Sequence, residues 1–342
     1  VGADQTHNKH SLNVVTTPHS LPSFVNDLAA QFMEYVGDTN RAKVTNRGFG
    51  YRFRNPIFDP KGSRDPFWYH IETFSFGSDH QVFTEAETRV PSVAFNNFHD
   101  AGYHTSEDTP RYLDPTQMKR AGFIGLAMGQ VMANATGSDA VAVATLSAAY
   151  GQRRLGEDLI GAVMMIAEAT TGEALHQAYK EARSRMQWAH WRENAQVHSA
   201  ATMIGEDTKA LEQLRRVEDA VAAGENIDLE RVKAAYLAKC TALDLEPIVD
   251  PPLSAEEREA DRLIPKKKKG MGPATVSRGD AVLERYYDVE ARHFADGSRS
   301  ILDVRNAISA EFGPVALEKV VAFFRALEES GTWTIETRDR PR

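Results

Sequence analysis

The segment DPTQMKRAGFIGLAMGQVMANA, Asp114–Ala135, marks the place where this chain changes character. It places Asp at the position of a helix N-cap and Pro115 at the first helical position, and it then runs apolar. We therefore predict a helix that closes a domain by packing on a sheet. Before this helix, short apolar runs alternate with helical patterns, whereas from Gly137 onward helical patterns dominate.

The first part of the chain, residues 1–136, has an α/β pattern. It holds most of the aromatic residues and most of the histidines. Leu12–Thr16 and Val90–Phe95 are predicted strands, because each is a short apolar run. Ser20–Val36 is a predicted helix, because its apolar residues recur on one face at helical spacing.

The second part, residues 137–264, is predicted to be an all-α bundle. Its four helices are predicted around Leu155–Ile166, over Glu173–His198, around Leu211–Val221 and around Leu229–Tyr236. Trp188 and Trp191 are expected in a core or a domain contact, whereas His190 and His198, like His7 and His10, are expected at the surface. The sequence SAEE, Ser254–Glu257, has the form of a capping box.

The third part begins with PKKKKGMGP, residues 265–273, which we interpret as a solvated linker rather than a nuclear or nucleic-acid signal. Residues 274–342 then contain a predicted helix, a Gly-Pro turn, a second helix and a strand-like tail. This order is typical of a small winged-helix-like module. We expect the linker to let this module move relative to the bundle.

Composition excludes several classes of function. The 342 residues are 42% hydrophobic and 26% charged, as in an ordinary globular protein. A net charge of -8 argues against a general nucleic-acid binder, and no run of about 18 apolar residues predicts a membrane span. The single cysteine, Cys240, excludes an internal disulfide and a multi-thiolate zinc site. No P-loop, nucleophile elbow, HExxH or dinucleotide motif is present.

The residues suited to chemistry gather in one region, from Gly77 to Asp108. GSDHQVF (residues 77–83) is a polar loop, VPSVAF (residues 90–95) is the predicted strand, and GYHTSEDTP (residues 102–110) is a second polar loop just past the end of that strand. Open α/β sheets bind ligands at the carboxyl ends of their strands. We therefore place the candidate site in these loops.

Three motifs in this order resemble the co-catalytic di-zinc exopeptidases of metallopeptidase family 28, which includes bacterial aminopeptidases. The matching residues are Gly77-Ser78-Asp79-His80 with Phe83, then Pro91, then Tyr103-His104-Thr105 with Asp108-Thr109. The resemblance covers roughly residues 1–135. It implies a mixed twisted sheet flanked by helices, in the arrangement of the phosphorylase/hydrolase-like zinc exopeptidases.

The resemblance also implies roles for individual residues. His104 would be the last zinc ligand in chain order, because neutral imidazole binds zinc well, and the intact enzyme would hold two Zn²⁺ ions. The Tyr103 phenol would help to hold the oxyanion that forms on the attacked carbonyl. Gly77, Ser78 and Asp79 would line the cleft that binds the peptide substrate. Asp79, His80, Thr105 and Asp108 would support the site, although a turn that bonds its own backbone is an equal alternative for each.

The family needs further zinc ligands and a Glu general base, and in the family these lie before the equivalent of Gly77. Val1-Gly2 looks like the tail of the strand that carries the second acidic ligand. We therefore expect this chain to hold the C-terminal half of a zinc peptidase domain and to be inactive alone. A further departure is that family members often have Gly before the strand proline, whereas EAETRVPSV (residues 85–93) does not, so we expect the pocket wall near Arg89 to differ.

Two other functions stay open. A catalytically dead relative could use the fold as a receptor or interaction surface. A nucleic-acid-binding role of the C-terminal module would need a basic helix, but the helix near Val315 offers Lys319 and Arg325 against three glutamates, Glu318, Glu328 and Glu329. Family members are frequently exported, so a periplasmic or secreted location is expected by analogy.

Overall fold

The chain is described by a computed structural model, and its helices and strands form a mixed α/β structure, as predicted. The described residues are 11–45, 57–63, 66–85, 88–97, 102–270, 276 and 282–338, with the side chains of 41–45 and 285 left out. Val1-Gly2, His7, His10 and His99 lie outside them. The chain divides into two compact units, residues 1–147 with 196–215, and residues 148–195 with 216–342.

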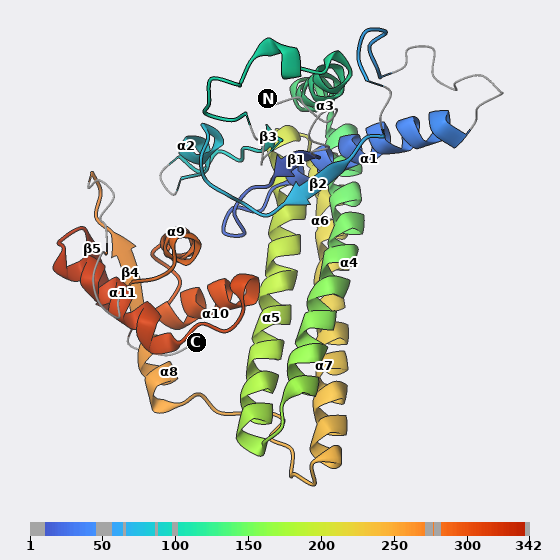
Figure 1. The fold of residues 1–342 in the computed structure, drawn as a ribbon. Helices are drawn as coiled ribbons and strands as arrows, with labels where there is room; N and C mark the ends of the chain where they lie inside the picture. Colours follow the sequence, from blue (N-terminus) through green and yellow to red (C-terminus); the bar gives the residue numbers. More distant parts are fainter. Residues whose placement is uncertain are drawn as a thin grey trace. The chain divides into compact units, whose positions relative to one another are not determined.

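The first unit contains a three-stranded mixed sheet (Figure 1). Its order is β2 (Tyr69–Glu72), β1 (Leu12–Val15), β3 (Ala94–Asn96), with β1 parallel to β2 and antiparallel to β3. All four residues of β1 are buried, because this strand is the central one. The predicted strand at residues 90–95 forms only from Ala94, since Pro91 has no amide proton to give to a ladder.

Two long helices belong to the same unit. Helix α1 (Phe24–Thr45) packs against α3 (Pro115–Asn134), and the ring of Phe123 is their aromatic contact. It meets Phe32 edge to face at 6.3 Å and stacks on Tyr35 at 5.8 Å. Short helical turns, α2 (His80–Thr84) and η1 (Pro110–Tyr112), lie in the connections. The predicted helix at Asp114–Ala135 is thus confirmed.

The start of α3 is held by one carboxylate. Asp114 caps the helix by accepting from the Thr116 amide at 3.0 Å, and it also accepts from the Ser63 amide at 2.9 Å and the Ser63 hydroxyl at 2.6 Å. A methyl group on Gly62 would overlap the Thr116 amide. Residues 57–63 are therefore joined tightly to the N-terminus of α3.

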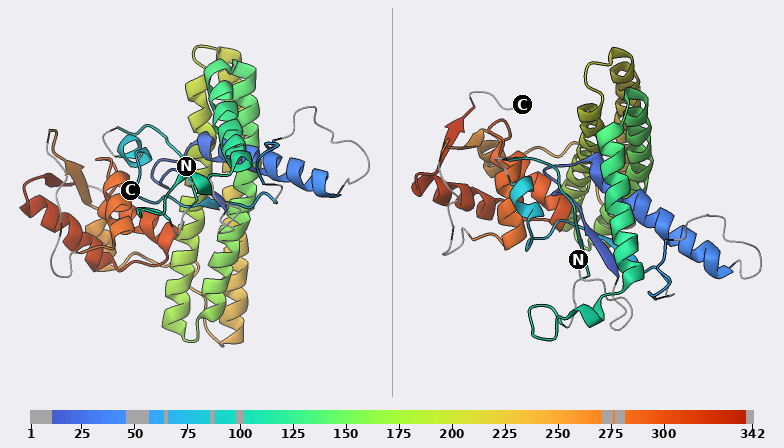
Figure 2. Two further views of the ribbon diagram at one scale, coloured as in Figure 1. Left: turned by 45° about the horizontal axis from the view of Figure 1, so that its top comes forward. Right: turned by 90° about the horizontal axis from the view of Figure 1, so that it is seen from above.

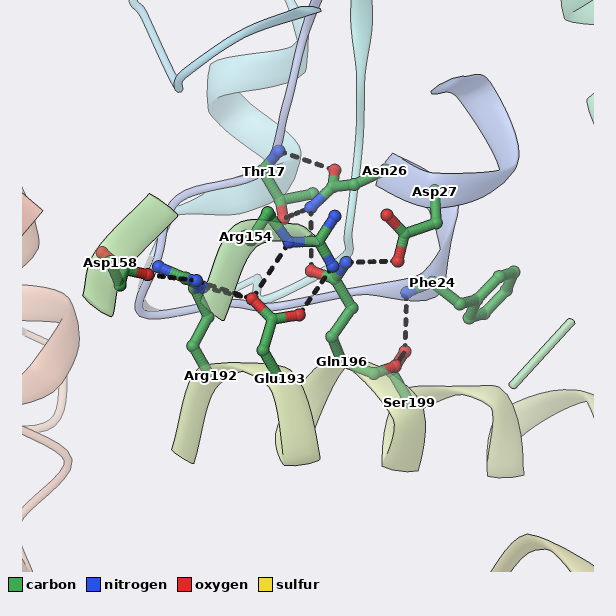
Figure 3. Close-up of polar contacts among 10 residues, drawn as sticks. All are labelled: Thr17, Phe24, Asn26, Asp27, Arg154, Asp158, Arg192, Glu193, Gln196 and Ser199. Carbon is green, nitrogen blue, oxygen red and sulfur yellow. Dashed lines mark hydrogen bonds and ion pairs between the residues drawn. The ribbon is translucent and has the colours of Figure 1, made fainter. Parts of the chain in front are cut away.

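The start of α1 is held by residues at the end of α5 (Gly172–His198) and in η2 (Ser199–Met203) (Figure 3). The Phe24 amide donates to the Ser199 hydroxyl at 2.8 Å, and the Gln196 amide donates to the Asp27 carboxylate at 2.5 Å. The first bond satisfies a backbone donor at the helix N-terminus, and the second, from the Gln196 side chain, fixes the Asp27 side chain in the first turn.

The second unit is built on the predicted helical bundle. It holds most of α4 (Gly137–Glu168) and of α5, the second half of α6 (Thr208–Ala222) and all of α7 (Gly224–Ala242). Within this unit α4, α5 and α7 run side by side (Figures 1 and 2). In its core Tyr179 stacks on Tyr236 with ring centroids 4.0 Å apart. Cys240 is buried in the same core as a free thiol. Among the helices that the structure describes, none combines the length and apolar character that a bilayer crossing demands.

Charged side chains are paired across α4 and α5 (Figure 3). Glu193 accepts from Arg154 at 2.6 Å and from Arg192 at 2.6 Å, and Arg192 also donates to Asp158 at 2.9 Å. Burial raises the pKa of Glu193, but the bonds and charges of the two arginines outweigh it and hold the pKa below its usual value. A side chain at Gly151 would meet the Glu193 carboxylate, so the two helices approach closely there.

His190 is not a surface residue, contrary to our prediction. It is 2% exposed, and its Nε2 lies 2.9 Å from the carboxylate of Asp228 on α7. Helical spacing could have predicted this burial, because His190 lies four residues after the buried Met186 and therefore on the same helix face. His198 is exposed, as predicted.

The C-terminal part of this unit, which we call the C-terminal module, comprises residues 255–270 and 282–338. Its elements are α8 (Ala255–Ala260), β4 (Leu263–Lys267), α9 (Arg285–Phe294), α10 (Ile301–Phe312), α11 (Leu317–Glu329) and β5 (Trp333–Thr337). The predicted capping box at Ser254 is confirmed. The predicted pattern of helix, Gly-Pro turn, helix and strand-like tail is α10, Gly313-Pro314, α11 and β5.

The segment predicted as a linker begins inside a strand. Leu263–Lys267 pairs antiparallel with β5, and Lys266 forms an ion pair of 2.6 Å with Glu336 across it. Residues 265–267 were thus assigned wrongly to the linker, because a lysine run on an edge strand has the same composition as a solvated one. Trp188 and Trp191 pack against the core of the C-terminal module, which confirms them as contact residues.

We predict that Asp114→Ala lowers the free energy of unfolding by about 2–3 kcal/mol, since it removes a helix cap and leaves the Ser63 donors unpaired. Urea unfolding followed by circular dichroism measures this. Asp139→Ala is the matched control, because Asp139 also accepts bonds near a helix start but lies exposed. Equal losses in the two variants would contradict the bridging role of Asp114.

We also predict that Glu311→Gln stabilises the chain at neutral pH. Burial raises the pKa of Glu311 well above its ordinary 4.5, helped by the neighbouring Glu290 and opposed by Arg192. The folded chain therefore holds a proton that the unfolded chain releases, and stability falls as the pH rises from about 4.5 through the folded pKa. The free energy of unfolding, measured from pH 4 upward, should fall less steeply with pH in Glu311→Gln than in the wild type. Parallel pH profiles of the two proteins would contradict the prediction.

Candidate functional site

The first candidate loop, Gly77–His80, follows β2. Gly77 has a φ of 119°, a backbone conformation that favours glycine. Ser78 and Asp79 are exposed, and their carbonyls accept from the amides of Gln81 and Val82 at 3.1 Å each, which turns the chain into α2. The loop therefore presents two short polar side chains to solvent.

His80 lies at the base of this loop and is buried. Its Nε2 donates to the Ser75 carbonyl at 2.7 Å, because a carbonyl can only accept. Its ring also meets the buried ring of Phe74 edge to face at 5.7 Å. His80 thus closes the segment from Ser75 to His80 into a compact loop, which is a positioning role.

The second candidate loop holds Tyr103 and His104. His104 has a φ of 61°, which is uncommon for a residue with a side chain. Its ring stacks on the Tyr103 ring with centroids 3.8 Å apart, and both side chains are exposed. The structure therefore brings these two predicted residues together and offers both a phenol and an imidazole to solvent.

Thr105 shapes the turn that holds His104. Its hydroxyl donates to the Gly102 carbonyl at 2.7 Å and accepts from the Glu107 amide at 3.1 Å. The Asp108 amide then donates to the Thr105 carbonyl at 3.2 Å. Such bonds are those of a hydroxyl turn, the alternative that we left open for Thr105.

Strand register decides where the two loops leave the sheet. Strand β2 ends at Glu72, which is paired with Val15 at the end of β1. Strand β3 is antiparallel and ends at Asn96, which is paired with Asn13 near the start of β1. The Gly77 loop and the Tyr103 loop therefore leave from opposite ends of the described strands.

Arg89 lies between these loops, just before β3. It has a φ of 47°, and its guanidinium donates to the Ser20 carbonyl at 3.1 Å. A left-handed backbone explains why a glycine would suit this position, and the bond to Ser20 offsets part of the strain of an arginine there.

Zinc binding needs three or four protein ligands in one place. Within the described part of the chain, no group of three or more His, Cys, Asp or Glu side chains could hold a metal ion. His104 is one exposed imidazole beside a tyrosine ring, so the described residues alone do not fit a complete zinc site.

The region that holds both candidate loops matches one known protein family. Residues 56–128 match the sequence model of Peptidase family M28, a metallopeptidase family. Comparison with curated proteins gave no match, and comparison with solved structures gave none.

Proposed function

We propose that this chain, whose residues 56–128 match the model of the M28 metallopeptidase family, carries part of the catalytic domain of a zinc-dependent aminopeptidase. In the complete enzyme His104 would supply one imidazole ligand to a two-zinc site, and other segments would supply the rest. Zinc would provide the activated water and polarise the carbonyl. The peptide substrate would lose its N-terminal residue.

One observation carries the proposal. Every residue that the motifs single out, from Gly77 to Asp108, lies inside the matched segment 56–128. The match also covers the loop at residues 57–63 and most of α3, which Asp114 joins into one element. The motifs, both loops and most of the closing helix therefore lie within one matched segment, which supports the proposal.

The protein groups in the site have separable tasks. The exposed Tyr103 phenol would donate a hydrogen bond to the carbonyl oxygen as negative charge develops on it. Its stacking on His104 limits its freedom, so less ordering is needed when substrate binds. Gly77, Ser78 and Asp79 would contact the peptide, while His80 and Thr105 keep the two loops in shape.

The rest of the chain would serve this peptidase. We propose a peptidase region at residues 1–136 with the phosphorylase/hydrolase-like arrangement, a helical domain that follows it, and a C-terminal winged-helix-like module. A periplasmic or secreted location is proposed by family analogy. A catalytically dead interaction protein is the second candidate, because within the described residues no group of three or more His, Cys, Asp or Glu side chains could hold a metal ion.

For this chain alone we predict no stoichiometric zinc binding at micromolar affinity and no turnover of aminoacyl chromogenic substrates, because one imidazole is too few ligands. Equilibrium dialysis with Zn²⁺ and a chromogenic assay measure the two properties. Stoichiometric zinc or turnover would contradict the need for ligands from other segments.

In the complete peptidase, substitutions of Tyr103 and of His104 should have different effects. We predict that His104→Ala lowers both zinc content and activity, since it removes a ligand. Tyr103→Phe should keep zinc and fold but lower kcat roughly 10- to 1000-fold, as expected for the loss of one oxyanion donor. Metal analysis and steady-state kinetics give these values.

Tyr112→Phe is a matched control, because Tyr112 lies nearby and its hydroxyl accepts from Arg111 at 2.8 Å. It should keep full kcat. If Tyr103→Phe also keeps full kcat, the oxyanion role is wrong. If the wild-type protein binds zinc yet shows no hydrolysis, the interaction protein becomes the better description.

A further inference from the structure

The C-terminal module inserts a guanidinium into an aromatic box. Arg299 lies over three rings, 4.7 Å from the centroid of Trp191, 5.6 Å from Trp188 and 5.7 Å from Phe294. Both tryptophans belong to α5, whereas Phe294 ends α9 of the C-terminal module. The box is therefore assembled from two separate parts of the second unit.

The three rings form walls of a corner. Trp188 meets Trp191 at 67° with centroids 5.4 Å apart, and Phe294 meets the two tryptophans at 71° and 59°. Arg299 lies over each of the three rings, so their negative faces border its guanidinium. A cation placed there is attracted by all three ring quadrupoles.

A tight turn at residues 296–299 positions the Arg299 side chain over the rings. Asp296 accepts from the Ser298 amide and hydroxyl at 2.8 Å each and from the Arg299 amide at 3.1 Å, and its other oxygen pairs with the Arg299 guanidinium at 2.9 Å. Burial raises the pKa of Asp296, but the Ser298 bonds and Arg299 outweigh it and keep the pKa below its usual value. Gly297, with a φ of 83°, permits the turn.

Contacts on the same side of α5 extend the junction. Arg305 of α10 donates to both carboxylate oxygens of Glu181, at 2.6 and 3.0 Å, and these side chains are 12% and 6% exposed. Lys180 pairs with Glu257 at 2.6 Å. Glu181 and Trp188 are seven residues apart on α5, so they share one helix face.

We propose that Trp188, Trp191 and Phe294 form a cation-binding site for guanidinium groups, and that Arg299 occupies it as a built-in ligand that latches the C-terminal module onto α5. Such a latch would limit the movement of the module that the sequence analysis expects. A planar guanidinium can stack on ring faces, whereas the compact ammonium of lysine cannot. The fixed Asp296 turn lowers the entropy lost when Arg299 enters the box.

A double-mutant cycle in the full chain tests the latch. Arg299→Ala and Trp191→Ala are made singly and together, and urea unfolding is followed by circular dichroism. Each single variant should shift the unfolding equilibrium about tenfold, as expected for a desolvated cation on aromatic rings. The double variant should shift it little further, because both changes remove the same contact.

The matched control is Arg325→Ala combined with Trp191→Ala. Arg325 is a similar arginine on α11, but it forms an exposed pair with Glu328 at 2.9 Å. These two changes should add without coupling. Additive effects of Arg299→Ala and Trp191→Ala, or a loss from Arg299→Ala no larger than that from Arg325→Ala, would overturn the latch.

Chemical rescue tests the box as a binding site. Methylguanidinium at low millimolar concentration should raise the Tm of Arg299→Ala, because the ion refills the vacated box, and should leave the wild type and the Arg299→Ala/Trp191→Ala variant unchanged. If Arg299→Ala does not fold by itself, methylguanidinium should restore its folded circular-dichroism spectrum and should not restore that of the Arg299→Ala/Trp191→Ala variant. An equal response of all three proteins, or no response in the single variant, would refute the guanidinium site.

Discussion

Helix α5 buries charged side chains along its length, and each of them must find a partner. A buried charge without one costs several kcal/mol. Within the second unit the partners come from different helices, since Glu193 pairs with Arg154 of α4 and Glu181 with Arg305 of α10. The His190 ring likewise has a polar partner, the Asp228 carboxylate of α7. Each pair permits one register of its helix along α5. The packing of the bundle and of the C-terminal module therefore depends on satisfying the charges of one helix.

Local signals in the sequence predicted local structure well. The cap at Asp114 with Pro115, the capping box at Ser254 and the helical spacings all act within a few residues, and the helices form where these signals lie. The mixed sheet was predicted as a class, but β2 was not recognised. Its residues Tyr69–Glu72 alternate between apolar and polar, but the run is only four residues long and only partly buried. Pairings between distant segments could not be predicted. For example, no residue near Lys266 in the sequence indicates that its partner is Glu336.

The candidate site also has features that the sequence predicts and features that it does not. The motifs identified Tyr103 and His104 together, and the left-handed backbone at His104 explains how a turn can present both rings. The tasks of His80 and Thr105 needed the structure, because a carbonyl partner such as that of Ser75 leaves no trace in side-chain patterns. A metal site assembled from ligands far apart in a chain is also invisible to spacing. The resemblance, rather than periodicity, therefore carried the expectation of zinc.

Cys240 can serve as a built-in probe of the opening of the helical bundle. It is the one cysteine of the sequence, and its thiol lies in the core of the bundle beside the stacked pair of Tyr179 and Tyr236. A thiol reagent in solution can reach it only in molecules whose bundle has opened, so its labelling rate counts those openings. The motions of this bundle can thus be timed in the unaltered protein, without a dye or an engineered residue.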